Sequence, residues 1–295
     1  YPAVPDQAQL DELREHALIF LYRLLFVLKA EAQNLLPMES DVGAETPYAR
    51  SASTASIFHD VKGISAHERT QVSAGYSKLL RLFELVDRGG DYGVPPYNGG
   101  LFDREKHPKL SELRLRDDVV YEVLRALIYL SDDERDPVPY AELDVRDFGD
   151  IYEGLLGQRF VSVRKHGVTL LQLRSQNGDQ KASGSYFTPD VLVEQVVRDT
   201  LAPLLAPART PTAEAVLGLR IVDPAMGSGH FLVKVVDVIA WDLTLRFDPA
   251  DPEAPRDNGP LEFAYWKRRV VESCIYGVDV NPMAVELAKV ALWLH

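Results

Sequence analysis

The chain has 295 residues, of which 46% are hydrophobic, so it is long enough for about two domains with buried cores. Its formal net charge is −12 and its isoelectric point is near 5.1, which argues against a compact basic module that grips nucleic acid by itself. Cys274 is the one cysteine; it excludes an internal disulfide framework, suits a reducing cytoplasm and is expected to be a buried thiol.

Apolar residues recur at helical spacing from Gln7 to Leu36 and predict one long helix. Its most apolar run, residues 17–28, is too short to cross a membrane and contains Arg23. We therefore expect no membrane span, and no secretory signal is recognisable. Residues 39–74 are polar and should be mainly loop, with a helix that enters near Ser65 and continues to Val86.

Further helices are expected over residues 110–130 and 145–156, and alternating residues predict a hairpin near 159–173. Residues 176–183 are polar and small, which is typical of a linker. The predicted organisation is a helical domain over 1–175 that includes the hairpin, a linker over 176–183, and a second domain over 184–295.

The most informative stretch is LRIVDPAMGSGHFLVKVVDVIA, residues 219–240. It predicts a strand that ends at the acid Asp223, a Gly-rich turn, and a helix from about His230. Such a turn opens a nucleotide pocket at the carboxyl end of a strand, and Gly227 and Gly229 allow close backbone approach. A P-loop would need a lysine after the glycines, and a dinucleotide fingerprint would need glycine where Leu232 stands. An S-adenosylmethionine site, another nucleotide pocket and a plain structural turn remain open.

Two neighbouring segments add context. In residues 184–197, GSYFTPDVLVEQVV, Thr188 is a plausible N-cap and Pro189 a plausible first residue of an apolar-striped helix. In residues 274–294, CIYGVDVNPMAVELAKVALWL, a second strand should end at Asp279, and Asn281 should cap the next helix. An acid at that strand tip offers two acceptors to a ribose diol. The plainer interpretations are a well-capped helix and two solvated strand ends.

GSYFTP, DPAMGSGHF and YGVDVNPMAVELAKVALWL, in this order, resemble motifs X, I and II of gamma-class adenine-N6 DNA methyltransferases of restriction–modification and phage-defence systems. Residues 22–37, 97–103 and 147–160 resemble the helical region that precedes the methylase domain in large single-chain enzymes of this kind. The resemblance implies an α/β fold, in which a mainly helical N-terminal region is followed by the first part of a Rossmann-like S-adenosylmethionine-dependent methyltransferase domain with a truncated parallel sheet.

The resemblance also implies roles for particular residues. Asp223 would contact the methionine end of S-adenosylmethionine, Asp279 would accept from both ribose hydroxyls, and Val280 would pack on the adenine ring. The remaining expected cofactor-binding residues supply close backbone or cover the methionine moiety: Tyr186, Thr188, Pro189, Ala225, Gly227 and Gly229.

The catalytic motif IV of the family, Asn/Asp-Pro-Pro-aromatic, is not recognisable. Residues 94–97, VPPY, imitate it, but Val94 cannot accept from an adenine amino group, and we interpret them as a polyproline-type turn. We therefore expect no catalytic residue here, and a fragment that is inactive alone. The isolated histidines His107, His166 and His230 offer no credible metal site.

The predicted function is site-specific adenine-N6 DNA methylation in a restriction–modification or phage-defence system, in the cytoplasm. Double-stranded DNA would be bound mainly through missing C-terminal parts, and restriction or defence subunits are possible partners. Three alternatives remain: an RNA or protein N-methyltransferase, a non-catalytic methylase-like assembly module, and a different nucleotide-binding enzyme.

Overall fold

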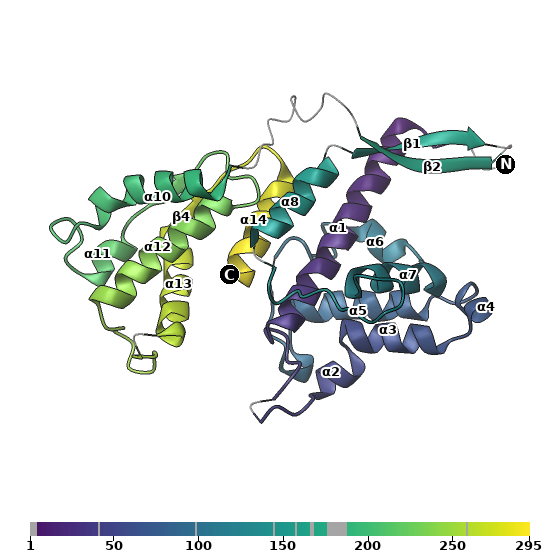
Figure 1. The fold of residues 1–295 in the computed structure, drawn as a ribbon, viewed down its shortest axis with the longest axis horizontal. Coiled ribbons are helices and arrows are strands. Elements are labelled where there is room, and N and C mark those ends of the chain that lie inside the picture. The colour runs from purple at the N-terminus through teal and green to yellow at the C-terminus, as the bar shows by residue number, and fades with distance from the viewer. Residues whose placement is uncertain are drawn as a thin grey trace. The chain divides into compact units, whose positions relative to one another are not determined.

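A computed structural model describes residues 5–40, 42–97, 99–143, 145–156, 158–165, 168–175, 188–257 and 259–295. The chain forms two compact units (Figure 1). The first comprises Tyr1–Asp144 and Gly157–Gln176, and the second comprises Val145–Leu156 and Asn177–His295.

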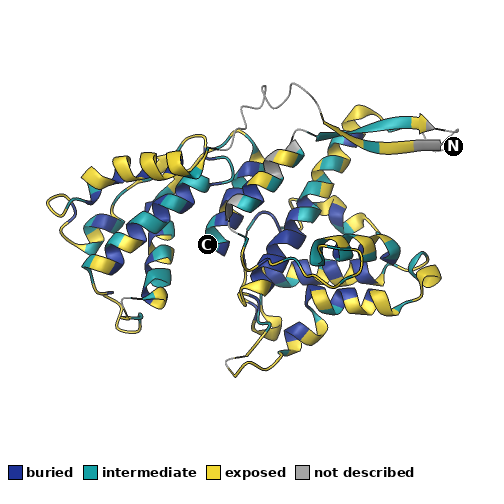
Figure 2. Cartoon of the chain, viewed as in Figure 1, coloured by how far each residue is buried: buried dark blue, intermediate teal, exposed yellow. Residues whose placement is uncertain are grey.

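The first unit is built around the long helix α1 (Gln7–Ala32), which begins with a capping box between Asp6 and Gln9. A continuous run from Tyr22 to Glu31 is buried, because neighbours cover α1 on more than one side (Figure 2). The aromatic rings of Phe26, Tyr97 and Phe102 meet in this core at centroid distances of 4.8, 5.1 and 5.5 Å. The other helical elements are α2 (Pro47–Ser51), α3 (Thr54–Gly63), α4 (Ala66–Arg69), α5 (Ala74–Arg88), the 3-10 turn η1 (Asp91–Gly93), α6 (Pro108–Glu112) and α7 (Asp117–Ile128).

The predicted hairpin is confirmed. Strands β1 (Gln158–Lys165) and β2 (Val168–Ser175) pair antiparallel from Gln158↔Ser175 to Lys165↔Val168, and β1 lies against α1. Residues 166–167, which join the two strands, and the predicted linker over 176–183 lie outside the described residues.

Two predictions for the first unit are wrong. Residues 39–74 are not mainly loop, because Ser53 caps α3 and Ile57, Phe58 and Val61 bury one face of it. The single helix over 110–130 is two helices, α6 and α7. The break follows from Asp117, which is fully buried at the start of α7; its Oδ1 accepts from Gly75 N at 2.9 Å and its backbone N–H donates to Val72 O at 2.9 Å.

The second unit is organised around α12 (His230–Arg246), which contacts most of its other elements. They are α8 (Val145–Leu156), α10 (Asp190–Leu205), α11 (Ala213–Leu217), β3 (Ile221–Asp223), α13 (Pro260–Cys274), β4 (Ile275–Gly277) and α14 (Pro282–Leu294). The core takes one apolar stripe from each of α10, α12 and α13: Val193, Val197, Leu201, Val235, Val236, Ile239, Ala240, Leu243, Trp266, Val270 and Cys274.

Strands β3 and β4 are parallel, with Ile221 opposite Ile275 and Asp223 opposite Gly277. Ile221 and Ile275 pack on the core, whereas Val222 and Tyr276, which point to the other face, are 60% and 48% exposed. Within the described ranges, helices therefore cover one face of this small sheet.

Helix α8 has the bounds expected from the sequence, but its neighbours differ from the expectation. The predicted first domain over 1–175 includes these residues, whereas α8 contacts α12 and α14 of the second unit. Among the described residues, no helix is long and apolar enough to cross a membrane.

Candidate cofactor site

The loops after β3 and β4 are joined by hydrogen bonds that continue the strand pairing. Val278 N donates to Asp223 O at 2.9 Å, and Met226 N donates to Val278 O at 3.0 Å. The Gly-rich turn and the acidic turn, 52 residues apart between Gly227 and Asp279, therefore form one surface at the carboxyl ends of both strands.

Asp279 is the main polar link in this surface. Its Oδ2 accepts from Gly227 N at 2.9 Å, and its Oδ1 accepts from Asn281 N at 2.8 Å. The Asn281 side chain in turn accepts from Met283 N at 3.0 Å and caps α14, as the sequence predicts. Each carboxylate oxygen has a second lone pair, so Asp279 can accept two further hydrogen bonds from a ligand.

The glycines of the two loops have different neighbours. Gly227 has a φ of 53°, and a Cβ built on it would meet no atom of the described residues within 4 Å. Gly229 has a φ of 91°, and its Cβ would lie 3.1 Å from Ala288 Cβ and 3.2 Å from Ala288 Cα. A Cβ on Gly277 would overlap the Met226 sulfur. Gly227 thus leaves open space beside the loop, whereas Gly229 and Gly277 permit close packing beneath it.

The start of α10 is tied to the start of α12. Asp190 Oδ1 lies 2.9 Å from His230 Nε2, and one turn further along both helices Lys234 donates to Glu194 at 2.7 Å. The bond from Lys234 lowers the pKa of Glu194. The two helices therefore begin side by side, and both N-termini, with their free N–H groups, lie at the same end of the unit.

His230 is the first residue of α12. One expectation about this region is wrong. The N-cap of α10 is Pro189 instead of Thr188: Pro189 has extended backbone angles, its carbonyl accepts from Val193 N at 3.1 Å, and no side chain caps the helix. Thr188 and Pro189 still lie directly before the helix start that His230 contacts.

The other expected site residues have these positions. Asp223 is partly buried and its Oδ1 accepts from Ala225 N at 3.0 Å, which shapes the turn. Val280 is fully exposed at the tip of the second loop. Tyr186 lies outside the described residues.

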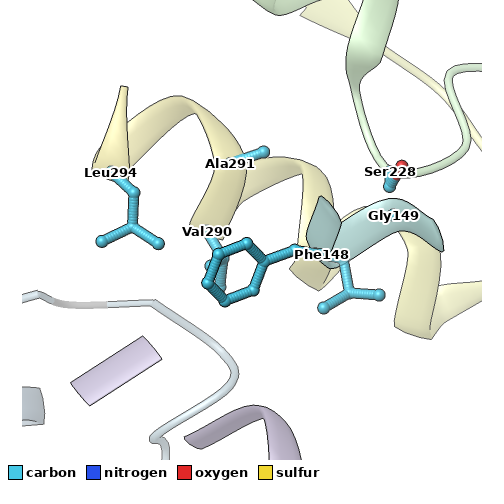
Figure 3. Close-up of a pocket in the computed structure, with 7 residues that line it drawn as sticks. Phe148, Gly149, Ser228, Val290, Ala291 and Leu294 are labelled. Carbon is cyan, nitrogen blue, oxygen red and sulfur yellow. The ribbon is translucent and has the colours of Figure 1, made fainter. Parts of the chain in front are cut away.

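Two hollows flank the Gly-rich turn. A pocket of about 280 Å³ lies between α10, β3 and α12, and Asp223, Pro224 and Ala225 of the turn contribute to its lining. On another side is a small apolar crevice between Ser228 of the turn, Phe148 and Gly149 of α8, and α14 (Figure 3). The contact between α8 and the turn has no signal in the sequence, since Phe148 and Ser228 are 80 positions apart.

The VPPY segment lies in the first unit. Val94 and Tyr97 are buried, Val94 has extended backbone angles of −69° and 124°, and Tyr97 N donates to Val86 O at 2.9 Å. With its ring packed on Phe26 and Phe102, Tyr97 serves the helical core. The described residues contain no group of three metal-ligating side chains.

The second unit is thus a mixed α/β structure in which a Gly-rich loop and an acidic loop meet at the ends of two parallel strands. The family model for N-6 DNA methylases matches residues 144–295, just over half of the chain. The chain belongs to the N-6 DNA methylase family. The matched region includes α8.

A relative from Methanocaldococcus jannaschii, described as a putative type II restriction enzyme and methyltransferase, is 23% identical over 336 residues. The alignment covers 99% of this chain and 26% of the relative, so the chain spans about a quarter of that protein's length. No solved structure matches the chain.

Proposed function

We propose that this chain is the helical and cofactor-binding part of a gamma-class adenine-N6 DNA methyltransferase that uses S-adenosylmethionine. Membership of the N-6 DNA methylase family supports the reaction class. The order of the three motifs along the chain supports the gamma class, and the named relative supports a role in restriction–modification or phage defence. In this proposal the second unit is the start of a Rossmann-like domain.

The residues around the turn fit the cofactor. Asp279 has spare acceptor capacity toward a ribose diol, Gly227 leaves open space, and Val280 is exposed where a purine ring can cover it. Thr188 and Pro189 stand beside the paired helix N-termini, and Tyr186 precedes them in the sequence. When bound, S-adenosylmethionine supplies an electrophilic methyl group on a sulfonium. The protein's task is to hold it in line with the target nitrogen and to exclude water.

The bond between Gly227 N and Asp279 Oδ2 carries this proposal, because it brings the motif I and motif II positions to one point. The test is calorimetric titration of the chain with S-adenosylhomocysteine. Asp279→Ala should weaken binding by at least about 1.5 kcal/mol, roughly tenfold, because it removes the acceptors for two ribose hydroxyls.

Asp248→Ala is the matched control, since Asp248 is an exposed aspartate of the same unit. Unchanged affinity in Asp279→Ala would contradict the assigned role of Asp279. Displacement of S-adenosylhomocysteine by a nicotinamide dinucleotide would favour a different nucleotide-binding enzyme.

We further propose that motif IV and the surfaces that recognise DNA belong to other parts of a longer polypeptide. The support is that the chain covers a quarter of its relative and that its VPPY segment is packed in the helical core. Double-stranded DNA is then the partner of the whole enzyme.

A further inference from the structure

The first unit contains a pocket of its own, separate from the two hollows at the Gly-rich turn and independent of the function proposed above. It lies between α1, α5 and the segment leading into α6, and its volume is about 200 Å³. A wider hollow of about 410 Å³ shares Arg88, Arg104 and Ser111 with it. The pocket has an arginine-rich lining: Arg23, Arg81, Arg88 and Arg104, against the two acids Glu84 and Asp87.

Arg23 forms the inner wall of this pocket and is unusually deep for an arginine, with 3% of its surface exposed. Its guanidinium lies 5.5 and 5.8 Å from the ring centroids of Phe83 and Phe102. Its Nε donates to Leu101 O at 2.7 Å, but its enclosed Nη2 finds no acceptor among the described residues. A buried charged donor without an acceptor costs folding free energy, so a ligand that supplies an acceptor to this guanidinium would be stabilising.

Asp87 and Asp103 act on Arg23 through charge and oppose the lowering of its pKa by burial, but neither forms an ion pair with it. Arg23 forms no ion pair within the described part of the chain, and neither do Arg81 and Arg104, which are exposed at the rim. Arg88 pairs with Glu84 at 3.3 Å, and both of these side chains are largely exposed. Burial lowers the pKa of Arg23 to about 10, so this guanidinium is still charged at neutral pH. The pocket therefore keeps a positive lining in a chain whose net charge is −12.

We propose that this pocket binds a phosphate group, with Arg23 at its base and Arg81, Arg104 and the Ser111 hydroxyl around it. A phosphate has several acceptor oxygens and up to two negative charges, so it can use guanidinium donors that approach from separate elements. A carboxylate, in contrast, has two oxygens and pairs with one guanidinium. The phosphate can come from a nucleic-acid backbone or from a free phosphate or nucleotide, and the experiment distinguishes these sources.

The experiment measures binding to the intact chain by calorimetry, first with inorganic phosphate at fixed ionic strength in chloride. A short DNA duplex without a terminal phosphate is then added as a competitor. Arg81→Gln and Arg104→Gln, singly and together, remove rim charges without disturbing the core. Arg50→Gln is the matched control, because Arg50 is exposed in the same unit and outside the pocket. Arg23→Gln is included with hydrogen exchange of α1 as a check of folding.

We expect each rim variant to weaken phosphate binding about three- to tenfold, the double variant to weaken it further, and Arg50→Gln to leave it unchanged. Competition by the duplex identifies the nucleic-acid backbone as the source, and absence of competition identifies free phosphate or a nucleotide; both support the site. Phosphate binding that is absent in the wild-type chain, or undiminished in the double rim variant, overturns the proposal whether or not Arg23→Gln folds.

Discussion

Gly227 and Gly229 are two residues apart in one turn, yet glycine is needed at the two positions for different structural reasons. Gly227 adopts a positive φ beside open space, so a methyl group there meets backbone strain alone. Gly229 combines a positive φ of 91° with close approach to the backbone of α14 at Ala288. The first should matter for what lies in the open space, and the second for the stability of the unit.

We therefore expect Gly229→Ala to destabilise the second unit by about 3 kcal/mol or more and Gly227→Ala by about 1 kcal/mol. The measurement is urea unfolding followed by tryptophan fluorescence, since Trp241, Trp266 and Trp293 all lie in this unit. The affinity for S-adenosylhomocysteine should fall in Gly227→Ala, although this variant keeps its fold. Equal losses of stability in both variants would refute this division of roles.

Cys274 should make the stability of the second unit depend on pH in the alkaline range. The thiol is fully buried at the end of α13, as expected from the sequence, and burial raises its pKa from 9.0 to about 11. The unfolded chain loses this proton first, so the stabilising effect of the neutral thiol is complete below about pH 9 and declines as the pH rises towards 11.

A thiol reagent at neutral pH should label Cys274 only as fast as the second unit opens. Cys274→Ala should remove part of the alkaline loss of stability, measured by the same fluorescence titration. Rapid labelling of the native chain would show that the thiol is accessible and that this interpretation is wrong.

At the scale of elements, Glu31 joins three helices of the first unit. Its Oε1 accepts from Tyr48 Oη at 2.8 Å and from Thr54 N at 2.9 Å, and its Oε2 accepts from the Thr54 hydroxyl. Burial raises the pKa of Glu31. A glutamine can keep all three bonds, because its amide nitrogen can donate to the Thr54 hydroxyl.

Glu31→Gln should therefore change the stability of the first unit by less than about 1 kcal/mol, whereas Glu31→Ala should cost about 3 kcal/mol, through orphaned donors and a cavity. Hydrogen exchange of α1 measures both. Because the pKa is raised, the contribution of Glu31 is largest below its ordinary value of 4.5 and is lost as the pH rises, and Glu31→Gln should abolish that dependence. A Glu31→Gln variant as unstable as Glu31→Ala would show that the charge itself is needed.

Strongly patterned elements could be predicted from the sequence. Helix α8 has the expected bounds, the hairpin is where the alternation placed it, and α12 begins at His230 as expected. Helix α3 was missed because its ten residues lie in a polar stretch and its apolar face has few members. The break between α6 and α7 depends on the bond that Gly75 N donates to Asp117, 42 positions away, which no periodicity reveals.

For the whole molecule, the proposal that motif IV lies elsewhere has a direct test. We expect the chain to bind S-adenosylhomocysteine but to transfer no labelled methyl group to any DNA, because we propose that the group that holds the target amine lies in another part of the polypeptide. A longer form that includes the remainder of the polypeptide should restore transfer. Transfer by the chain alone would contradict the assignment of motif IV, and an inactive longer form that still binds cofactor would favour a non-catalytic module.

Contacts between residues far apart in the sequence could not be predicted at this scale. The position of Asp223 at the end of β3 follows from local patterns, whereas β4 ends at Gly277, two residues before Asp279, where the strand was expected to end. The contact of His230 with Asp190 and the burial of Arg23 against Leu101 depend on tertiary packing. The candidate site was therefore predictable as a set of loops, while its connection to α8 and α10 was not.

The single hydrogen bond from the backbone of Gly227 to the carboxylate of Asp279 has a practical consequence. Substitutions on either side of it should give effects that do not add, because each alters the reference state of the other. Anyone who evolves altered nucleoside selectivity in this protein would therefore do better to randomise residues 225–229 and 278–281 in one library than in successive rounds.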